Sequence, residues 1–230
     1  MNRLHVYELL FRQHGPQGWW PSQSPFETMV GAVLTQRTAW LNAVRAIDAL
    51  RRAGLLTPAR MRAEPVESLA AHIRASGFFR AKARKLHALC GYLASHGDDV
   101  EALRSIGVAR LRAELLAVHG VGPETADAIM LYAVGVPTFV VDAYAERVFS
   151  RLGEPSATKG YGQLQAWLMD GLPADAELLG EYHALLVRHG REMCTARQPR
   201  CHACSLRRWC ATATRTQPSW PTHPRAPSNR

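Results

Sequence analysis

The chain has 230 residues, of which 47% are hydrophobic and 20% are charged, the composition of an ordinary globular protein with one sizeable domain or two small ones. No apolar run approaches the roughly 18 residues of a membrane-spanning helix, and the first residues are too polar for a secretory signal peptide. We therefore expect no membrane association and a cytoplasmic location, on the nucleoid if the source is bacterial. The net charge of +9 favours a polyanionic partner such as nucleic acid, although by itself it is equally compatible with simple solubility.

The pattern of apolar residues predicts one helix after another, and strand-like alternation is almost absent. Ser24 and Pro25 form a cap and a first-turn proline, which are typical of a helix start, and an apolar face follows them. The best strand candidate, 137–141, is short, so the expected class is all-α. The tail 211–230 is rich in Pro, Ser and Thr, which predicts disorder. Further helices are predicted over 38–53, 65–75, 80–95, 110–117, 123–134, 142–152, 161–170 and 176–193.

The stretch HGVGPETADAI, residues 119–129, predicts a tight turn that leads into a helix. Gly120 and Gly122 permit positive backbone angles and let the main chain approach a ligand closely. A helix that starts at Pro123 would present its free N–H groups to an anion. Glu124 falls in the first turn of that helix, where an acid interacts favourably with the helix dipole. A glycine pair before a helix is a weak motif when it stands alone.

Four of the five cysteines fall within residues 194–210, with the spacing Cys194-x6-Cys201-x2-Cys204-x5-Cys210. Without a secretory signal, a disulfide framework is the poorer explanation, which leaves zinc or an iron–sulfur cluster. One compact and unequal group favours iron–sulfur, because zinc ribbons use two separated Cys-x2-Cys pairs. The fifth cysteine, Cys90, stands at an apolar helical position and is expected in the core.

The cysteine spacing resembles that of the endonuclease III family of DNA glycosylases, in which four cysteines hold a [4Fe-4S] cluster. The order of hairpin, helix, short apolar segment and Asp142 at the head of another helix resembles the helix-hairpin-helix/Gly-Pro-Asp superfamily of DNA glycosylases. The resemblance covers the chain from about residue 20 to about residue 210. It implies two helical lobes beside a DNA-binding cleft: a six-helix barrel domain with the hairpin over 24–136, and an iron–sulfur domain formed by 1–23 and 137–210. It also implies that Asp142 is the catalytic carboxylate, a role compatible with capping a helix.

Glu124 marks a departure from the bifunctional members of that superfamily. Those members carry a lysine two residues after the second hairpin glycine, and its amine forms a Schiff base with the sugar. A carboxylate cannot do so, and the three lysines of this chain, Lys82, Lys85 and Lys159, are remote in sequence. We therefore expect AP lyase activity to be weak or absent, with Glu124 acting as a helix-start acid or, alternatively, ordering water at the catalytic site.

The aromatic residues of the N-terminal part resemble those of the monofunctional 3-methyladenine DNA glycosylase branch, in which such residues stack on the extruded base. An alkylated purine is cationic and leaves without a general acid, so it needs an electron-rich aromatic slot and one carboxylate. We expect Trp19, Trp20 and Trp40 to form the base pocket; the alternative is that they only dock the N-terminal segment. The chain departs from this branch in one respect: it has the four clustered cysteines, which the enzyme of that branch lacks.

Two further residues match positions that fill the gap left by a flipped base. Gln36 matches a family glutamine that occupies the vacated space, and Phe78 lies where the family inserts an apolar wedge. The alternatives are a helix-end amide and a core aromatic. Phosphate contacts are expected from Arg80, Lys82, Arg84 and, in the loop between the first two cysteines, Arg197 and Arg200.

The favoured function is a monomeric, monofunctional glycosylase that removes damaged bases from double-stranded DNA, with alkylated purines such as 3-methyladenine as substrates. The first alternative is an endonuclease III-type glycosylase and AP lyase for oxidised pyrimidines. The second is a non-catalytic lesion-binding or redox-sensing protein.

Overall fold

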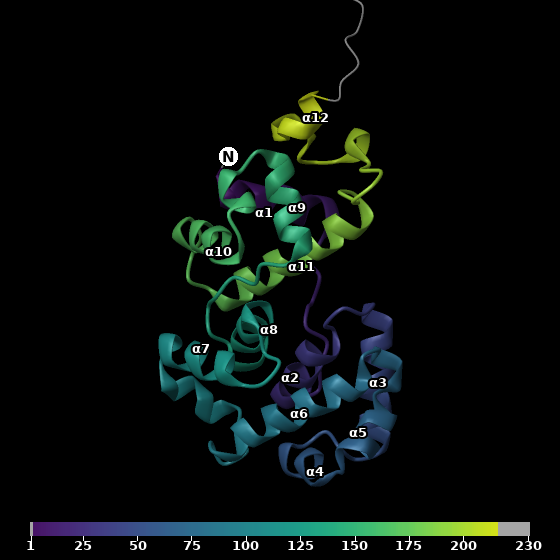
Figure 1. Cartoon of the computed structure of the whole chain (residues 1–230). Helices are drawn as coiled ribbons and strands as arrows, with labels where there is room; N and C mark the ends of the chain where they lie inside the picture. Colours follow the sequence, from purple (N-terminus) through teal and green to yellow (C-terminus); the bar gives the residue numbers. More distant parts are fainter. Residues whose placement is uncertain (1, 216–230) are drawn as a thin grey trace, which may run out of the picture.

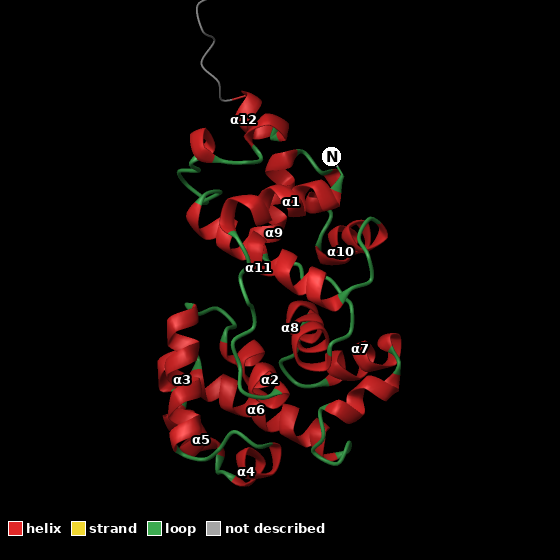
Figure 2. Ribbon diagram, turned by 180° about the vertical axis from the view of Figure 1, so that it is seen from behind, coloured by secondary structure: helices red, strands yellow, loops and turns green. Residues whose placement is uncertain are grey.

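A computed structural model describes residues 2–215, and this part of the chain consists of helices and loops without a strand. The expected all-α class is confirmed. Figures 1 and 2 show two helical lobes that meet at a narrower waist. The expected domain boundaries at residues 24 and 137 stay a prediction. Within residues 2–215, no helix has the length and apolar character needed to cross a bilayer.

The first lobe contains the consecutive helices from α2 to the π-helix η3. Their bounds are α2 (Pro25–Leu34), α3 (Trp40–Arg52), α4 (Pro58–Ala63), α5 (Val66–His72), η1 (Arg74–Ser76), α6 (Phe79–Ala94), η2 (Glu101–Ile106), α7 (Val108–Ala117), α8 (Pro123–Ala128) and η3 (Ile129–Val134). The second lobe combines the first helix of the chain with those that follow η3. Their bounds are α1 (Arg3–His14), α9 (Ala143–Leu152), η4 (Pro155–Thr158), α10 (Tyr161–Asp170), α11 (Ala176–Glu192), η5 (Cys201–Ala203), η6 (Arg207–Trp209) and α12 (Ala211–Arg215).

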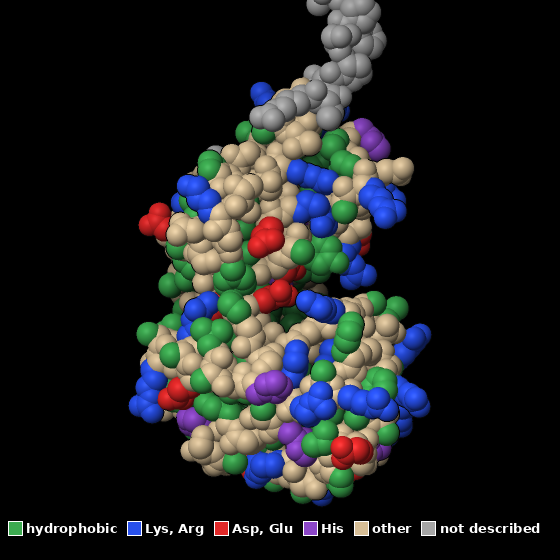
Figure 3. Space-filling model, in the orientation of Figure 1, with side chains coloured by type: hydrophobic (Ala, Val, Ile, Leu, Met, Phe, Trp, Pro, Cys, Tyr) green, Lys and Arg blue, Asp and Glu red, His purple; other side chains and the backbone are tan. Residues whose placement is uncertain are grey.

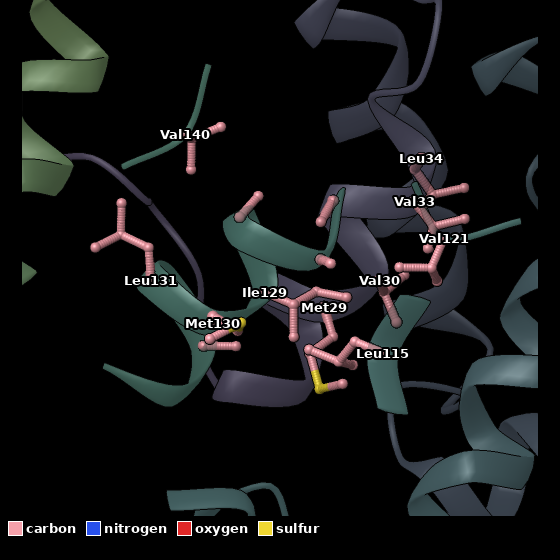
Figure 4. Packing of buried hydrophobic residues seen from close by; sticks show 14 of the residues in the cluster. Met29, Val30, Val33, Leu34, Leu115, Val121, Ile129, Met130, Leu131 and Val140 are labelled. Atoms are coloured by element: carbon pink, nitrogen blue, oxygen red, sulfur yellow. The ribbon is translucent and has the colours of Figure 1, made fainter. Parts of the chain in front are cut away.

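Helix α2 is the centre of the first lobe, and every residue from 26 to 34 is buried. Its start is fixed as the sequence predicts: Ser24 Oγ accepts from the Glu27 N–H at 3.2 Å, and Pro25 occupies the first turn. Figure 4 shows its apolar side chains packed against residues of α7, the hairpin and η3, including Val121. The hairpin is therefore anchored to the most buried helix of the lobe.

Asp127, on α8, is fully buried and joins the two lobes through a polar cluster. Arg112 of α7 donates to its two oxygens at 2.8 and 3.1 Å. Tyr161 and Gln165 of α10 donate to Asp127 Oδ2 at 2.6 and 2.8 Å. Four hydrogen-bond donors compensate the cost of burying this carboxylate. Because the donors come from α7 and α10, the cluster fixes α8 to both lobes.

The local structure departs from the sequence-based picture in one expectation, the disordered tail from residue 211, and adds detail at two other places. Helix α1 was not predicted; its residues Val6 and Leu10, one turn apart, are buried, and α1 packs against α11. The best strand candidate, 137–141, is a loop, in agreement with the all-α class. Residues 211–215 form α12 instead of disordered chain, because α12 packs beside α9 and buries Ala213. The rest of the predicted tail, 216–230, lies outside the described residues.

Candidate functional site

A cleft of about 1130 Å³ lies where the two lobes meet, and it collects half of the residues singled out in the sequence. Figure 3 shows the molecule hollowed at the waist, with Lys and Arg side chains around the hollow and acidic side chains beside it. The predicted residues that line the cleft are Trp19, Trp20, Gln36, Trp40, Phe78, Lys82, Gly122, Glu124 and Asp142. The predicted residues outside its lining are Arg80, Arg84, Gly120, Arg197, Arg200 and the four cysteines.

Asp142 caps α9 and presents its carboxylate to the cleft. Its Oδ1 accepts from the N–H groups of Tyr144 and Ala145 at 2.9 and 2.8 Å, so the side chain has a fixed orientation. The second oxygen, Oδ2, lies 3.5 Å from Nε2 of His183 on α11. The carboxylate thus stands at the positive end of a helix with one oxygen fully occupied and the other facing the cleft.

Glu124 lies in the first turn of α8 and lines the same cleft as Asp142 and His183. Burial raises the pKa of its carboxyl above the ordinary 4.5, the negative charge of Asp142 raises it further, and His183 acts in the opposite direction. Its side chain remains open to solvent through the cleft. Two carboxyl groups therefore share one cleft, and the surroundings of Glu124 favour its neutral form more than those of an ordinary surface glutamate.

The hairpin uses the conformational freedom of only one of its two glycines. Gly120 has φ +83°, and the stem of Lys85 lies where a β-carbon of residue 120 would stand. Gly122 precedes α8 with φ −98° and ψ −179°, so a positive angle is not needed there. Apart from its chain neighbours, no described residue has an atom within 4 Å of the β-carbon position at Gly122, and Gly122 lines the cleft.

The three tryptophans gather on one wall of the cleft and pack on each other. Trp19 lies 4.5 Å from Trp40 and 5.0 Å from Trp20 between ring centroids, and Trp20 lies 5.4 Å from Trp40. Trp20 also rests on Gly31, whose β-carbon would come within 2.9 Å of the indole. The slot expected between the rings is therefore filled by their own packing, and a base must stack on an outer face or displace a ring.

Gln36 and Phe78 face the same cleft from two different loops. Gln36 Nε2 donates to Gly120 O at 3.1 Å and to Thr125 Oγ1 at 2.9 Å, so its amide is tied to the hairpin. Phe78 is 65% exposed and has φ +46°, an unusual angle for a bulky residue, directly before α6. Their insertion into DNA stays a prediction, but Phe78 is not the core aromatic of the alternative.

Lys82 is not available for the expected phosphate contact. It is 2% exposed, and its Nζ donates to Leu34 O at 2.8 Å and to Ser76 O at 2.7 Å. Burial lowers the pKa of its amine to about 8, with a smaller effect from Lys85. Lys82 therefore ties the end of α2 to the turn before Phe78, whereas Arg80 and Arg84 on the same helix are exposed.

The four clustered cysteines line one small cavity between the end of α11 and α12. None of them is in a disulfide, and Arg151 Nη1 lies 3.2 Å from Cys194 Sγ. In residues 2–215, no three His, Cys, Asp or Glu side chains meet closely enough to hold a single metal ion. Four thiols around one cavity are nevertheless a suitable donor set for a polynuclear iron–sulfur group. Cys90 is fully buried elsewhere, as expected of a core residue, and burial raises the pKa of its thiol to about 12.

Local sequence patterns single out neither His183, which lines the cleft, nor Tyr132 behind it, and they do not foresee the contact that Lys85 makes there. His183 stands among the buried residues of α11, where an apolar periodicity gives no reason to single out one histidine. Lys85 Nζ donates to Gln36 Oε1, a contact between residues 49 positions apart that no local pattern predicts. Arg197 and Arg200 are exposed in the loop after Cys194.

The comparisons with known proteins agree with this architecture. The chain is 37% identical over 207 residues to a candidate DNA repair glycosylase of Methanocaldococcus jannaschii, covering 89% of this chain and 94% of that protein. The structure is similar to that of the 3-methyladenine DNA glycosylase of H. pylori bound to 1,N6-ethenoadenine, with a TM-score of 0.74 and 25% identity over 84% of this chain and 98% of the other.

It is also similar to a non-covalent endonuclease III–DNA complex, with a TM-score of 0.73 and 26% identity over 94% of this chain and 98% of the other. Residues 30–174 match the HhH-GPD superfamily of base excision DNA repair proteins. The chain belongs to this superfamily of DNA glycosylases.

Proposed function

We propose that the protein is a monofunctional DNA glycosylase that hydrolyses the N-glycosidic bond of alkylated purines, such as 3-methyladenine, in duplex DNA. The observation that carries the proposal is the pair of carboxyl groups in the cleft: Asp142 is oriented by α9, and Glu124 occupies the place of the Schiff-base lysine. Lys82 is buried and Lys85 is bound to Gln36, so neither offers a free amine in the unliganded cleft.

The chemistry requires one carboxylate and one water molecule. The C1′–N bond breaks and both its electrons leave with the base, so a cationic alkylpurine departs as a neutral molecule while positive charge develops on the sugar. Asp142 stabilises that charge and accepts a proton from the water that attacks C1′. The products are a free base and an abasic site in an uncut strand.

The tryptophan wall supports the choice of an alkylated purine. A cationic base gains cation–π attraction and stacking on an indole face, each worth on the order of 1 kcal/mol. The structural neighbour from H. pylori holds a modified adenine, 1,N6-ethenoadenine. Glu124 serves in this proposal as a helix-start acid; a role in ordering the attacking water is the alternative.

Duplex DNA containing a damaged base is the proposed partner of the monomeric protein. Phe78 acts as the wedge and Gln36 fills the vacated space, because both line the cleft and Gln36 is hydrogen-bonded to the hairpin. The net charge of +9 favours the polyanion. The residues proposed to bind phosphates are the exposed arginines Arg80, Arg84, Arg197 and Arg200, together with the backbone of Gly120 and Gly122.

The proposal includes a [4Fe-4S] cluster held by Cys194, Cys201, Cys204 and Cys210, which would fix the loop that bears the arginines. We expect a brown protein with broad absorption near about 400 nm and about four iron atoms per chain. Serine at any of the four positions should lower the iron content, whereas Cys90→Ser is the matched control and should leave it unchanged. An anaerobically purified, colourless protein with one zinc ion would contradict the assignment.

Excision from defined duplexes tests the substrate class. Oligonucleotides that carry 3-methyladenine, 7-methylguanine, thymine glycol, uracil or 8-oxoguanine are incubated with the protein, and released base and strand scission are measured separately. We expect release of the alkylated purines without scission.

A second candidate is an endonuclease III-type enzyme for oxidised pyrimidines, which the cysteine spacing and the likeness to endonuclease III favour. Release of thymine glycol with a nicked strand would select this candidate.

A further inference from the structure

His183 Nε2 is a buried nitrogen atom that has no hydrogen-bond partner among the described residues. The His183 side chain is 9% exposed and lines the cleft, and its Nε2 lies 3.5 Å from Asp142 Oδ2. A buried polar atom without a partner costs free energy. The position of His183 Nε2 beside Asp142 Oδ2 therefore indicates a functional reason for this histidine.

The other side of the imidazole decides which nitrogen carries the proton. His183 Nδ1 lies 2.7 Å from Tyr132 Oη, which also lies 2.9 Å from Gly180 O. Burial raises the pKa of Tyr132 well above its ordinary 10, and the charges of Asp142 and Glu181 act in the same direction. Tyr132 therefore stays a neutral phenol with a single proton to share between two acceptors.

The proton of the phenol can be used in two ways. If the phenol donates to His183 Nδ1, the imidazole carries its own proton on Nε2, which then points at Asp142. If the phenol donates to Gly180 O instead, Nδ1 would have to donate to Oη, and the lone pair of Nε2 would face the Asp142 carboxylate. The second arrangement is repulsive, so the first is favoured, and it places Nε2–H opposite Asp142 Oδ2.

We infer that His183 is a positioning residue, which donates from Nε2 to Asp142 Oδ2 while the start of α9 holds Oδ1. The inference rests on the proposed function, in which Asp142 faces the sugar cation. With one oxygen bound by two backbone N–H groups and the other by an imidazole, the carboxylate cannot rotate away from the sugar. The 3.5 Å separation is long for a hydrogen bond, as is common for catalytic groups before the substrate closes the site.

The two amide substitutions of histidine separate this contact from simple packing. His183→Gln places an N–H near the position of Nε2, whereas His183→Asn places one near Nδ1 and leaves Asp142 without a donor. Tyr182→Phe is the matched control: Tyr182 precedes His183 on α11, is fully buried, and donates from Oη to Arg3 O at 2.9 Å, away from the cleft.

The readout is the affinity for two duplexes with an abasic-site analogue. One carries a protonated pyrrolidine, which mimics the developing sugar cation, and the other carries a neutral tetrahydrofuran. The ratio of the two dissociation constants measures how well Asp142 faces the sugar, and it does not depend on which base the enzyme excises. We expect His183→Asn to reduce this ratio by between about tenfold and a hundredfold, the range that a misplaced reacting group costs. His183→Gln should keep it within about threefold, and Tyr182→Phe should leave it unchanged.

An unchanged ratio in His183→Asn would overturn the inference, as would an equal loss in His183→Asn and His183→Gln. Binding of the tetrahydrofuran duplex reports that each variant is folded. If His183→Asn does not fold, Tyr132→Phe takes its place. Loss of Oη removes the hydroxyl that keeps the imidazole proton on Nε2, so the ratio of dissociation constants should again fall. An unchanged ratio in Tyr132→Phe would overturn the inference.

Excision of 3-methyladenine, measured with the same proteins, keeps the two proposals apart. A wild-type protein that prefers the pyrrolidine duplex but releases no alkylated purine contradicts the proposed substrate and leaves the role of His183 supported. A wild-type protein that does not prefer the pyrrolidine duplex overturns both the proposed function and the proposed role of His183.

Discussion

Two aspartates at the waist of the molecule, Asp127 and Asp142, show how surroundings separate a structural carboxylate from a candidate catalytic one. Asp127 is fully buried and accepts from an arginine, a tyrosine and a glutamine, which occupy both of its oxygens. Asp142 has one oxygen saturated by the start of α9 and a second that faces the cleft. A carboxylate with all its hydrogen-bonding capacity used internally holds the fold together, whereas one that is rigid yet incompletely satisfied retains the capacity to stabilise a cation.

Asp142→Asn removes the charge at the open oxygen and should give the largest effect. Excision should fall by about a hundredfold to a thousandfold, the usual cost of one preorganised electrostatic group. Asparagine caps helices as well as aspartate, so the melting temperature should change little, and DNA binding should persist or tighten. Single-turnover excision, calorimetry and a binding titration measure the three quantities; full excision by this variant would overturn the catalytic assignment.

Asp127→Asn should reverse that pattern, with a loss of stability and little loss of chemistry. Removing one partner of a buried ion pair costs about 3 kcal/mol in unfolding free energy, the lower end of the usual range because Arg112 is partly solvated. Urea unfolding measures the cost, and Asp48→Asn in the exposed pair with Arg51 is the control, expected to cost less than about 1 kcal/mol. A variant that keeps full stability but loses excision would contradict the comparison.

Glu124→Gln tests the third acidic residue at the waist and should have the smallest effect on excision and stability. Because the pKa of Glu124 is raised in the folded state, its contribution to stability is fully present below the ordinary 4.5 and is lost as the pH rises through the folded pKa. The variant should therefore melt about one or two degrees above the wild type at pH 7, a difference kept small by solvent screening. The difference should vanish near pH 4. Excision should change by less than about tenfold if Glu124 only interacts with the helix dipole.

The sequence predicts the residues whose role depends on local order, and it fails where the role depends on packing. The cysteine spacing and the position of Asp142 before a helix follow from neighbours in the chain. Lys82 was misassigned although a local signal existed: it shares a helical stripe with Leu86, Leu89 and Leu93, all of which are buried.

The contacts of Asp127 and His183 had no comparable signal. Asp127 acquires its donors from α7 and α10, and His183 meets Asp142 only because α11 packs against α9. Partners this distant in sequence are set by tertiary structure, which no periodicity records. The closed packing of the three tryptophans is likewise a property of the assembled wall of the cleft.

Borohydride trapping tests most directly the claim that this cleft works through a carboxylate without an amine. The wild-type protein and Glu124→Lys are each incubated with a duplex that contains an abasic site, and any Schiff base is reduced to a stable adduct and measured by gel shift under denaturing conditions. The account predicts no adduct with the wild type, and an adduct with Glu124→Lys if residue 124 faces the sugar as proposed. A covalent adduct formed by the wild-type protein would contradict the account.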